Sequence, residues 1–423
     1  MSDELRLGWS RHDITPDHPV PLAGYASRAA LGPASSVLTP LHLRVIALRQ
    51  GDRTVVIMVG DLLWFGPDNM ARIESSLRDR YGLAPEQLIV NGTHTHSGPQ
   101  PSSWFAVGLG DPDPSWVDSL HDHVVAATGE ALASSVPVTM AIAQAPYRLG
   151  VERRFARSGG RERAAHLQQQ LSVITFRAAD AADEIVAIAM HHACHPTLHS
   201  DNAITADFAG AAADSLEAAG DARIALYLQG CCGNVNPDAY DGTQFQHGGL
   251  PEITAMGEGL AVAVRAILGD GVEVAPSLTW ARRDVAVPTE PAPEVAELER
   301  LAGLGLLKES GWARLLLERP ERRAASPLRL SRIGLGEDLQ LIGLGAEVTS
   351  PYANHVTEVF GPRALTLGYC NGMLTYLVTA EQLADGGYEP DDAPFWFGMP
   401  GRFTPEVEAT VYEGLDAVGV DRA

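Results

Sequence analysis

Short apolar runs that alternate with helix-like stretches set the strongest limit on what this chain can fold into. The apolar runs lie at residues 43–48, 54–59, 87–90, 138–143, 172–176, 185–190, 224–228 and 339–344, and the helix-like stretches lie at 67–81, 115–134, 208–219 and 252–268. Runs of about four to eight apolar residues bounded by turns indicate buried strands, and apolar residues three or four apart indicate helices. Strands that alternate with helices predict an α/β fold built in layers.

One shift in composition interrupts this pattern. Residues 285–295 hold three prolines in eleven residues, and a helix-like stretch rich in Leu, Glu and Arg runs from Glu294 to residue 323. An apolar run resumes at residue 339. We therefore expect a single domain over residues 1–423, with a helical insertion at about 289–325, rather than two domains.

Charge and composition exclude several classes of partner. The chain has 31 Lys and Arg against 53 Asp and Glu, a formal net charge of −22, which disfavours nucleic acid and anionic lipid surfaces. No window reaches ~18 consecutive apolar residues, so we expect no stable membrane insertion. The chain does not open with a basic segment followed by an apolar one, and its four cysteines form no CxxC pair, which predicts a cytoplasmic protein. Many alanines, and arginine in place of nearly all lysine, suggest a bacterial source.

Two histidines follow one of the predicted strands. Residues 91–99 read NGTHTHSGP directly after the run QLIV, so a strand is expected to deliver His94 and His96 into a Gly/Pro loop. Residues i and i+2 of an extended backbone point to the same face, so both imidazoles are expected at one site. Such a pair suits a metal ligand with a hydrogen-bonding neighbour, whereas two surface-loop histidines are the alternative.

A second predicted strand also ends in histidines. His191, His192 and His195 cannot all face one way, and each of them alone is as well explained as a core or loop histidine. Together with the first pair, however, five of the 14 histidines lie at two strand ends, which favours a metal centre. Asp207 either orients a ligand histidine or caps the helix that follows it.

Three further segments place polar residues after apolar runs. Residues 229–237, QGCCGNVNP, form a Gly-rich turn that could present backbone N–H groups to an oxyanion, although it lacks the GKS/T ending of a P-loop. Glu347 follows the run at 339–344, and Tyr376 follows a Gly turn. Taken singly, Glu347 is expected to be a solvated loop residue and Tyr376 a core aromatic.

Taken in order, these segments resemble the catalytic region of the neutral/alkaline (non-lysosomal) ceramidase family. The matching elements are THTHSGP at 93–99, which is the most specific, DITP at 13–16, LAGY at 22–25, QGCCGNVNP at 229–237, and TYLVTAEQL at 375–383 followed by GGYEP at 386–390. The resemblance spans nearly the whole chain and implies a layered α/β zinc hydrolase domain of the neutral ceramidase type. It is much less specific for the substrate.

Carried over residue by residue, the family pattern implies one Zn²⁺ per chain with four protein ligands, namely His94, His195, Glu347 and Tyr376. His96 would donate a hydrogen bond beside the metal without binding it. Arg153 or Arg154 would be the arginine of the family's Asn-Arg element and would act together with His96, although Glu152 stands where the family has Asn. Tyr388 matches a tyrosine that lines the substrate site. Supporting or substrate-contacting roles are expected for Asp207, Gly233, Asn234 and Asn236.

Two departures from the family pattern bear on the reaction. Asn234 replaces an Asp and Asn236 replaces a Ser, so any contact that needs the Ser hydroxyl is absent. We also expect neither the C-terminal immunoglobulin-like domain nor the secretory signal of ceramidases in this protein. Membrane ceramide is therefore not the expected substrate.

The resemblance predicts a zinc-dependent hydrolase that cleaves the amide (N-acyl) bond of a small molecule through a zinc-activated water. His96 and an arginine would stabilise the oxyanion, and Glu347, Tyr388 or a protonated His96 would protonate the leaving group. The alternatives are an esterase or lactonase of the same fold in secondary metabolism, and a zinc-bearing, catalytically idle binding protein. A metal-free structural domain would require the expected ligands to lie apart.

The substrate is expected to be a small molecule with an acyl group. Trp104 and Phe105, in a loop after the first histidine pair, either flank that acyl group or simply anchor their loop. The Leu-rich inserted helices could mediate a homo-oligomer or pack on the body of the protein.

Overall fold

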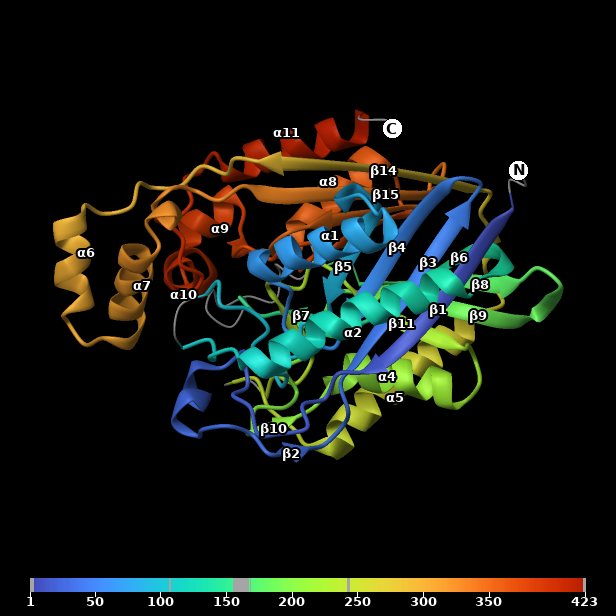
Figure 1. Ribbon diagram of the computed structural model, residues 1–423, viewed down its shortest axis with the longest axis horizontal. Coiled ribbons are helices and arrows are strands. Elements are labelled where there is room, and N and C mark those ends of the chain that lie inside the picture. The colour runs from blue at the N-terminus through green and yellow to red at the C-terminus, as the bar shows by residue number, and fades with distance from the viewer. Residues whose placement is uncertain (1–3, 106–107, 155–166, 168, 242–243, 421–423) are drawn as a thin grey trace.

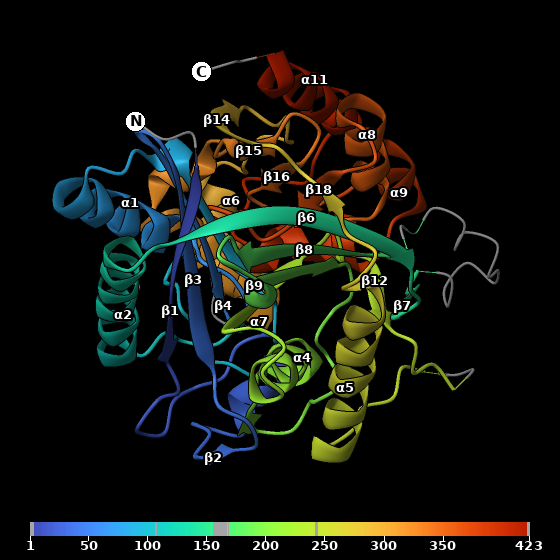
Figure 2. The same cartoon turned by 90° about the vertical axis from the view of Figure 1, so that its right-hand side faces the viewer.

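A nine-stranded sheet and a four-stranded sheet pack against each other and carry helices on their outer faces (Figure 1, Figure 2). The computed structural model describes residues 4–105, 108–154, 167, 169–241 and 244–420. The α/β class predicted from the alternation of strands and helices is confirmed.

The strands of the larger sheet are, in spatial order, β11 (Ile224–Gln229), β9 (Ala181–His192), β8 (Gln170–Ala178), β6 (Val136–Pro146), β1 (Leu5–Asp13), β3 (His42–Gln50), β4 (Arg53–Gly60) and β5 (Leu88–Gly92), with β13 (Val272–Glu273) beside β6. Neighbours are antiparallel except for the parallel pairs β4–β5 and β9–β11. Seven of the eight predicted strands fall in this sheet. Each lies inside an observed strand or extends at most one residue beyond its end.

The smaller sheet has the order β14 (Pro276–Val285), β15 (Leu328–Gly336), β16 (Gln340–Leu344) and β18 (Ala364–Leu367). Residues of β4 show how the layers form. Val55, Ile57 and Val59 face the smaller sheet, whereas Val56 and Met58 face the helices on the other side. Because side chains alternate along a strand, a strand that is apolar at every position is buried on both faces.

Three pairs of helices cover the sheets (Figure 2). α1 (Pro67–Tyr81) and α2 (Pro114–Ala133) pack on β3, β4 and β5, α4 (Asp207–Ala218) and α5 (Leu250–Ile267) pack on β8, β9 and β11, and α8 (Pro351–Phe360) and α11 (Val407–Val420) pack on the smaller sheet. Residues at both ends of α1 explain where this helix begins and ends. Pro67 occupies its first turn, and Gly82, with a φ of 68°, ends it in the left-handed conformation.

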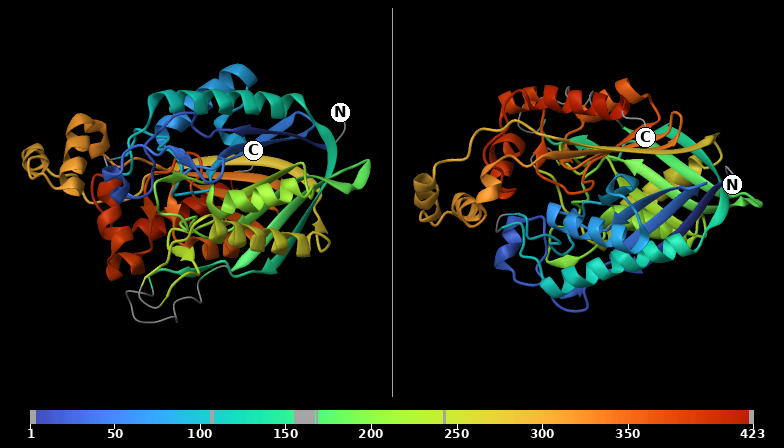
Figure 3. Two further views of the ribbon diagram at one scale, coloured as in Figure 1. Left: turned by 90° about the horizontal axis from the view of Figure 1, so that it is seen from below. Right: turned by 45° about the horizontal axis from the view of Figure 1, so that its top comes forward.

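The stretch expected as a helical insertion forms α6 (Val295–Ala302), α7 (Leu307–Glu318) and a 3₁₀ turn (Pro320–Arg323). The two helices project from the body of the molecule (Figure 3). They share a small core of their own, which contains Leu298, Trp312, Ala313 and Leu316. In the part of the chain that the structure describes, no helix is both long and apolar enough to cross a membrane.

Two pairs of very short strands bring distant segments together near the ends of β5, β9 and β11. β7 (Gly150–Glu152) pairs with β12 (Val235–Pro237), and β17 (Glu347–Val348) pairs with β19 (Tyr376–Leu377). The second pair is parallel and places Glu347 directly opposite Tyr376. These pairings converge on the histidines that follow β5 and β9.

Candidate metal centre

His94 lies in the loop after β5 and adopts a left-handed backbone conformation, with a φ of 69°. Its N–H donates to the carbonyl of Leu62 (2.8 Å), and its ring Nδ1 lies 2.9 Å from the carbonyl of Leu63. The Nε2 atoms of His94 and His96 lie 3.1 Å apart. The two rings therefore share one site, but the expected reason is wrong, because the backbone at His94 is not extended.

Main-chain carbonyls fix the tautomers of two histidines. Nδ1 of His94 faces the carbonyl of Leu63 at 2.9 Å, and Nδ1 of His195 faces the carbonyl of Val235 at 3.2 Å. A carbonyl can only accept, so each Nδ1 carries the proton and each Nε2 is left with its lone pair. A neutral histidine in this tautomer presents Nε2 as a metal ligand.

Both Nε2 atoms face one carboxylate oxygen. Oε1 of Glu347 lies 3.1 Å from Nε2 of His94 and 2.8 Å from Nε2 of His195, and all three side chains are buried. Burial alone would raise the pKa of Glu347, but the charges and hydrogen bonds of the two histidines outweigh it and hold that pKa well below its usual value. Burial lowers the pKa of His195 to about 4.

This donor set fits a metal ion. An ionised carboxylate and two imidazole lone pairs at hydrogen-bond distance repel one another unless a cation or an extra proton lies between them. The lowered pKa of His195 opposes an extra proton on that ring at neutral pH. Imidazole nitrogen and carboxylate oxygen are the ligands that zinc prefers besides thiolate.

His96 completes a cluster of three imidazoles. One ring nitrogen from each of His94, His96 and His195 lies within 4.8 Å of the others, and among the described residues this is the group whose ligand atoms converge in this way. His96 differs from the other two because its buried Nδ1 has no hydrogen-bond partner among the described residues. Burial lowers its pKa, and the neighbouring His94 and His195 lower it further.

Tyr376 borders the cluster through its pairing with Glu347. Its hydroxyl accepts a hydrogen bond from Nη2 of Arg153 (3.0 Å). Burial raises the pKa of Tyr376 well above its usual value, although Arg153 acts in the opposite direction. Without a metal the phenol therefore keeps its proton.

The two adjacent arginines have different surroundings. Arg153 reaches the site, since its Nη1 lies 3.5 Å from Nε2 of His195 and its Nη2 binds Tyr376. Arg154 points away from the histidines, with Nη1 on Oε2 of Glu389 (2.6 Å) and Nη2 on backbone carbonyls at residues 382 and 386. Glu389 also accepts from Nε of Arg153 (2.9 Å), so it holds both guanidinium groups.

The turn at 229–237 supports the site and uses four of its N–H groups within the protein. The N–H groups of Gly230, Cys232, Gly233 and Val235 all donate to main-chain carbonyls. A Cβ at Gly233 would lie 2.9 Å from the carbonyl oxygen of Val348 and 3.0 Å from that of Glu347, so only glycine allows this approach. These four N–H groups are therefore not free to bind an oxyanion, and an oxyanion site elsewhere in the turn stays a prediction.

The two asparagines of that turn do different things. Asn234 accepts the N–H of Ser350 (2.8 Å) and donates to Oε1 of Glu152 (3.3 Å), so it joins the segments on either side of the site. Asn236 accepts from Nη1 of Arg153 (3.4 Å) and so contacts a residue that touches the histidine cluster.

Asp207 and Tyr388 also have defined places. Asp207 is the first residue of α4, and its carboxylate accepts the N–H groups of Leu198 (3.0 Å) and His199 (3.3 Å). It thus fixes the loop after His195 rather than an imidazole ring. The ring of Tyr388 lies 5.7 Å from that of Tyr376, and burial raises its pKa above the usual value.

The loop with Trp104 and Phe105 is anchored by its aromatic residues. Trp104 lies under the guanidinium of Arg322 (4.1 Å), and Phe105 packs against Trp64 with ring centroids 4.7 Å apart. Trp64 in turn lies 6.1 Å from the ring of His94. These contacts anchor the loop beside the cluster.

Sequence reasoning missed two residues that hold the site together. Gln229 ends an otherwise apolar strand and ties the His94 loop to the His195 loop through its side chain. Its polar character at the buried end of β11 was the signal. Tyr369 stacks on His94 with ring centroids 4.0 Å apart. No local pattern marks that tyrosine, because the contact joins residues far apart in the chain.

Comparison with known proteins places the fold. No protein-family profile matches the sequence, and no curated protein does. Among solved structures, the neutral ceramidase from Pseudomonas aeruginosa matches with a TM-score of 0.80 at 19% identity, over 99% of this chain and 74% of that one. A ceramidase complexed with C2 matches with a TM-score of 0.79 at 18% identity, over 99% of this chain and 75% of that one. The chain thus has the fold of a neutral ceramidase.

Proposed function

On this fold, we propose that the protein is a zinc-dependent hydrolase that cleaves the amide (N-acyl) bond of a small molecule. One observation carries the proposal. Two buried imidazole lone pairs and an ionised carboxylate face one another within 3.1 Å, an arrangement that a cation would stabilise. The likeness to two ceramidase structures supports the choice of an amide bond.

We assign His94, His195, Glu347 and Tyr376 as the ligands of one zinc ion. His94 and His195 are the histidines whose Nδ1 atoms face main-chain carbonyls, which supports a permanent role as ligands. Nδ1 of His96 has no hydrogen-bond partner within the described part of the chain, so the ring can change its tautomer, which supports a role as hydrogen-bond donor beside the ion. Zinc at this site would activate a water molecule at neutral pH by lowering its pKa towards ~7.

The protein groups around the cluster would bind and orient the scissile bond. The guanidinium of Arg153, held by Glu389, and the ring of His96 would donate to a developing oxyanion. Loss of one such donor typically lowers the rate by about 10²–10³. Tyr388 stays protonated because burial raises its pKa, so its hydroxyl can donate to the substrate or to the leaving group.

The four cysteines are free and buried, which supports a location in a reducing compartment such as the cytoplasm. The substrate would be a small acyl-bearing molecule. An ester or lactone would meet the same groups, and an idle binding protein would keep the metal without turnover.

Metal content and a substrate panel test the proposal. The wild type should contain about one zinc per chain, His94→Ala should lose zinc and activity, and His96→Ala should keep zinc while its rate falls by about 10²–10³. His355→Ala, whose half-buried ring has Nε2 3.1 Å from Oδ1 of Asp416, is the control. N-acyl amines and matching esters assayed together separate the amide hydrolase from an esterase. Full activity in His94→Ala, or a folded wild type without zinc after zinc reconstitution, would refute the assignment.

A further inference from the structure

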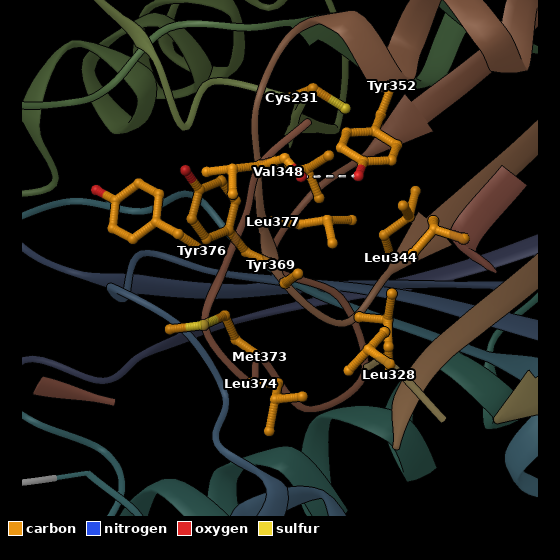
Figure 4. Packing of buried hydrophobic residues seen from close by; sticks show 14 of the residues in the cluster. Cys231, Leu328, Leu344, Val348, Tyr352, Tyr369, Met373, Leu374, Tyr376 and Leu377 are labelled. Carbon is orange, nitrogen blue, oxygen red and sulfur yellow. Dashed lines mark hydrogen bonds between the residues drawn. The ribbon is translucent and has the colours of Figure 1, made fainter. Parts of the chain in front are cut away.

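The ring of Tyr369 lies flat against the ring of His94. Their centroids are 4.0 Å apart and their planes differ by 24°. Tyr369 is fully buried, in the same apolar cluster as Tyr376, Tyr352 and Cys231 (Figure 4). The stack fixes the plane of the imidazole, and the carbonyl of Leu63 beside Nδ1 then leaves Nε2 facing the cluster.

Both stacked residues occupy a backbone conformation that disfavours side chains. φ is 69° at His94 and 55° at Tyr369, in the left-handed region that bulky residues rarely adopt. Such a residue persists only where its surroundings hold it. The surroundings therefore favour this stack over two relaxed loops.

The hydroxyl of Tyr369 shares a hydrogen bond with a thiol. It lies 3.0 Å from Sγ of Cys232, and both residues are buried. Cys232 belongs to the turn in which the carbonyl of Val235 accepts from the N–H of His195 (2.9 Å) and faces its Nδ1 (3.2 Å). The hydroxyl is thus connected to the segment that orients His195.

The backbone of Tyr369 reaches a third segment. Its N–H donates to the carbonyl of Ala346 (2.8 Å), the residue before Glu347. One residue therefore touches His94 with its ring, the turn behind His195 with its hydroxyl, and the neighbour of Glu347 with its backbone.

We propose that Tyr369 is a positioning residue that holds the three segments of the metal site in register, through its stack on His94 and its hydrogen bond to Cys232. The inference rests on the proposed function, since it concerns the zinc that these segments would bind. Tyr369 itself is not a ligand in this proposal. Groups that orient metal ligands typically contribute 10–100-fold to metal affinity.

The test compares two variants with two matched controls. Tyr369→Phe keeps the stack and removes the hydroxyl, and Cys232→Ala removes the thiol. Tyr352→Phe removes another buried tyrosine hydroxyl, which donates to the carbonyl of Val378 (3.0 Å), and Cys231→Ala removes the adjacent buried thiol. Zinc affinity is measured by competition with a chromophoric chelator, and the geometry of the site by the absorption spectrum of the Co²⁺-substituted protein.

We expect Tyr369→Phe and Cys232→Ala each to weaken zinc binding by about 10-fold and to change the Co²⁺ spectrum. The double variant should lose little more than either single variant, because both remove the same bond. Tyr352→Phe and Cys231→Ala should bind zinc as the wild type does.

The outcomes separate the two proposals. A wild type that binds no zinc overturns the proposed function. A wild type that binds zinc, with unchanged affinity and spectrum in both Tyr369→Phe and Cys232→Ala, overturns only the role of Tyr369. An equal loss in the two controls also overturns that role, because the effect would then belong to the core in general.

Discussion

The side chain of Gln229 joins two loops that end in proposed zinc ligands. Its Nε2 donates to the carbonyls of Thr93 (2.8 Å) and Cys194 (2.9 Å), and its Oε1 accepts the N–H of Cys194 (3.3 Å). Thr93 precedes His94 and Cys194 precedes His195. Gln229 is fully buried, so water cannot take over these bonds.

Gln229→Met keeps the length of the side chain and removes all three bonds. Two carbonyls and one N–H are then left buried without partners, and each such group costs about 1–3 kcal/mol. Because the third bond is long, we expect a loss of about 3–6 kcal/mol in the free energy of unfolding. That is a large share of the ~5–15 kcal/mol that holds a typical protein folded.

Urea unfolding followed by tryptophan fluorescence measures this loss, and zinc content measured on the folded protein shows whether the site loosens first. Gln144→Met is the control, since the half-buried Gln144 of β6 donates to Oγ of Ser172 in the neighbouring β8 and to the carbonyl of Pro362. A free energy of unfolding for Gln229→Met within about 0.5 kcal/mol of the wild-type value would refute the reasoning.

Three further predictions concern the arginines, the acid side of the stability curve and the close approach at Gly233. Arg153→Lys should keep zinc and lower kcat/KM by about 10²–10³, whereas Arg154→Lys should mainly lower the melting temperature; equal kinetic losses would contradict the assignment of Arg153. Burial lowers the pKa of His191 to about 4 from 6.5, so the unfolded chain takes up this proton at a higher pH. The neutral His191 therefore contributes about 3 kcal/mol at most to the free energy of unfolding. This contribution is present above the pKa of the unfolded chain and is lost as the pH falls through the pKa of the folded protein. In His191→Gln, the urea-unfolding midpoint should therefore fall less steeply between pH 7.5 and 4 than in the wild type. The same slope in both proteins would contradict this prediction. Gly233→Ala should destabilise the protein by about 1–3 kcal/mol and weaken zinc binding, since its Cβ would press on the carbonyl of Glu347; wild-type zinc affinity would count against this.

Local patterns predict the helices and strands well where their signals lie within one element. α1 (Pro67–Tyr81) begins and ends as predicted because a proline starts it and Gly82 ends it. β14 and β15 are harder to predict, since Arg282, Arg283, Arg329 and Arg332 interrupt their apolar residues. These two strands pair with each other although α6 and α7 separate them in the chain, and the pairing buries the apolar residues between the arginines. Such burial depends on tertiary structure, so the local sequence does not predict it.

The site is predictable in its residue types and less so in its geometry. Histidines at two strand ends already indicate a cluster. The meeting of Glu347 with Tyr376 depends on a parallel bridge of two residues, and the stack of Tyr369 on His94 depends on a left-handed turn. No periodicity in the sequence encodes such contacts, because they are fixed only when the sheets close.

The spread of the proposed ligands along the chain also bears on how the protein acquires its metal in the cell. His94 and Tyr376 lie roughly 280 residues apart, which a ribosome at about 10 residues per second covers in roughly half a minute. During that interval the early histidines have no carboxylate or phenol to complete their coordination. Zinc loading would therefore come after synthesis rather than on the nascent chain.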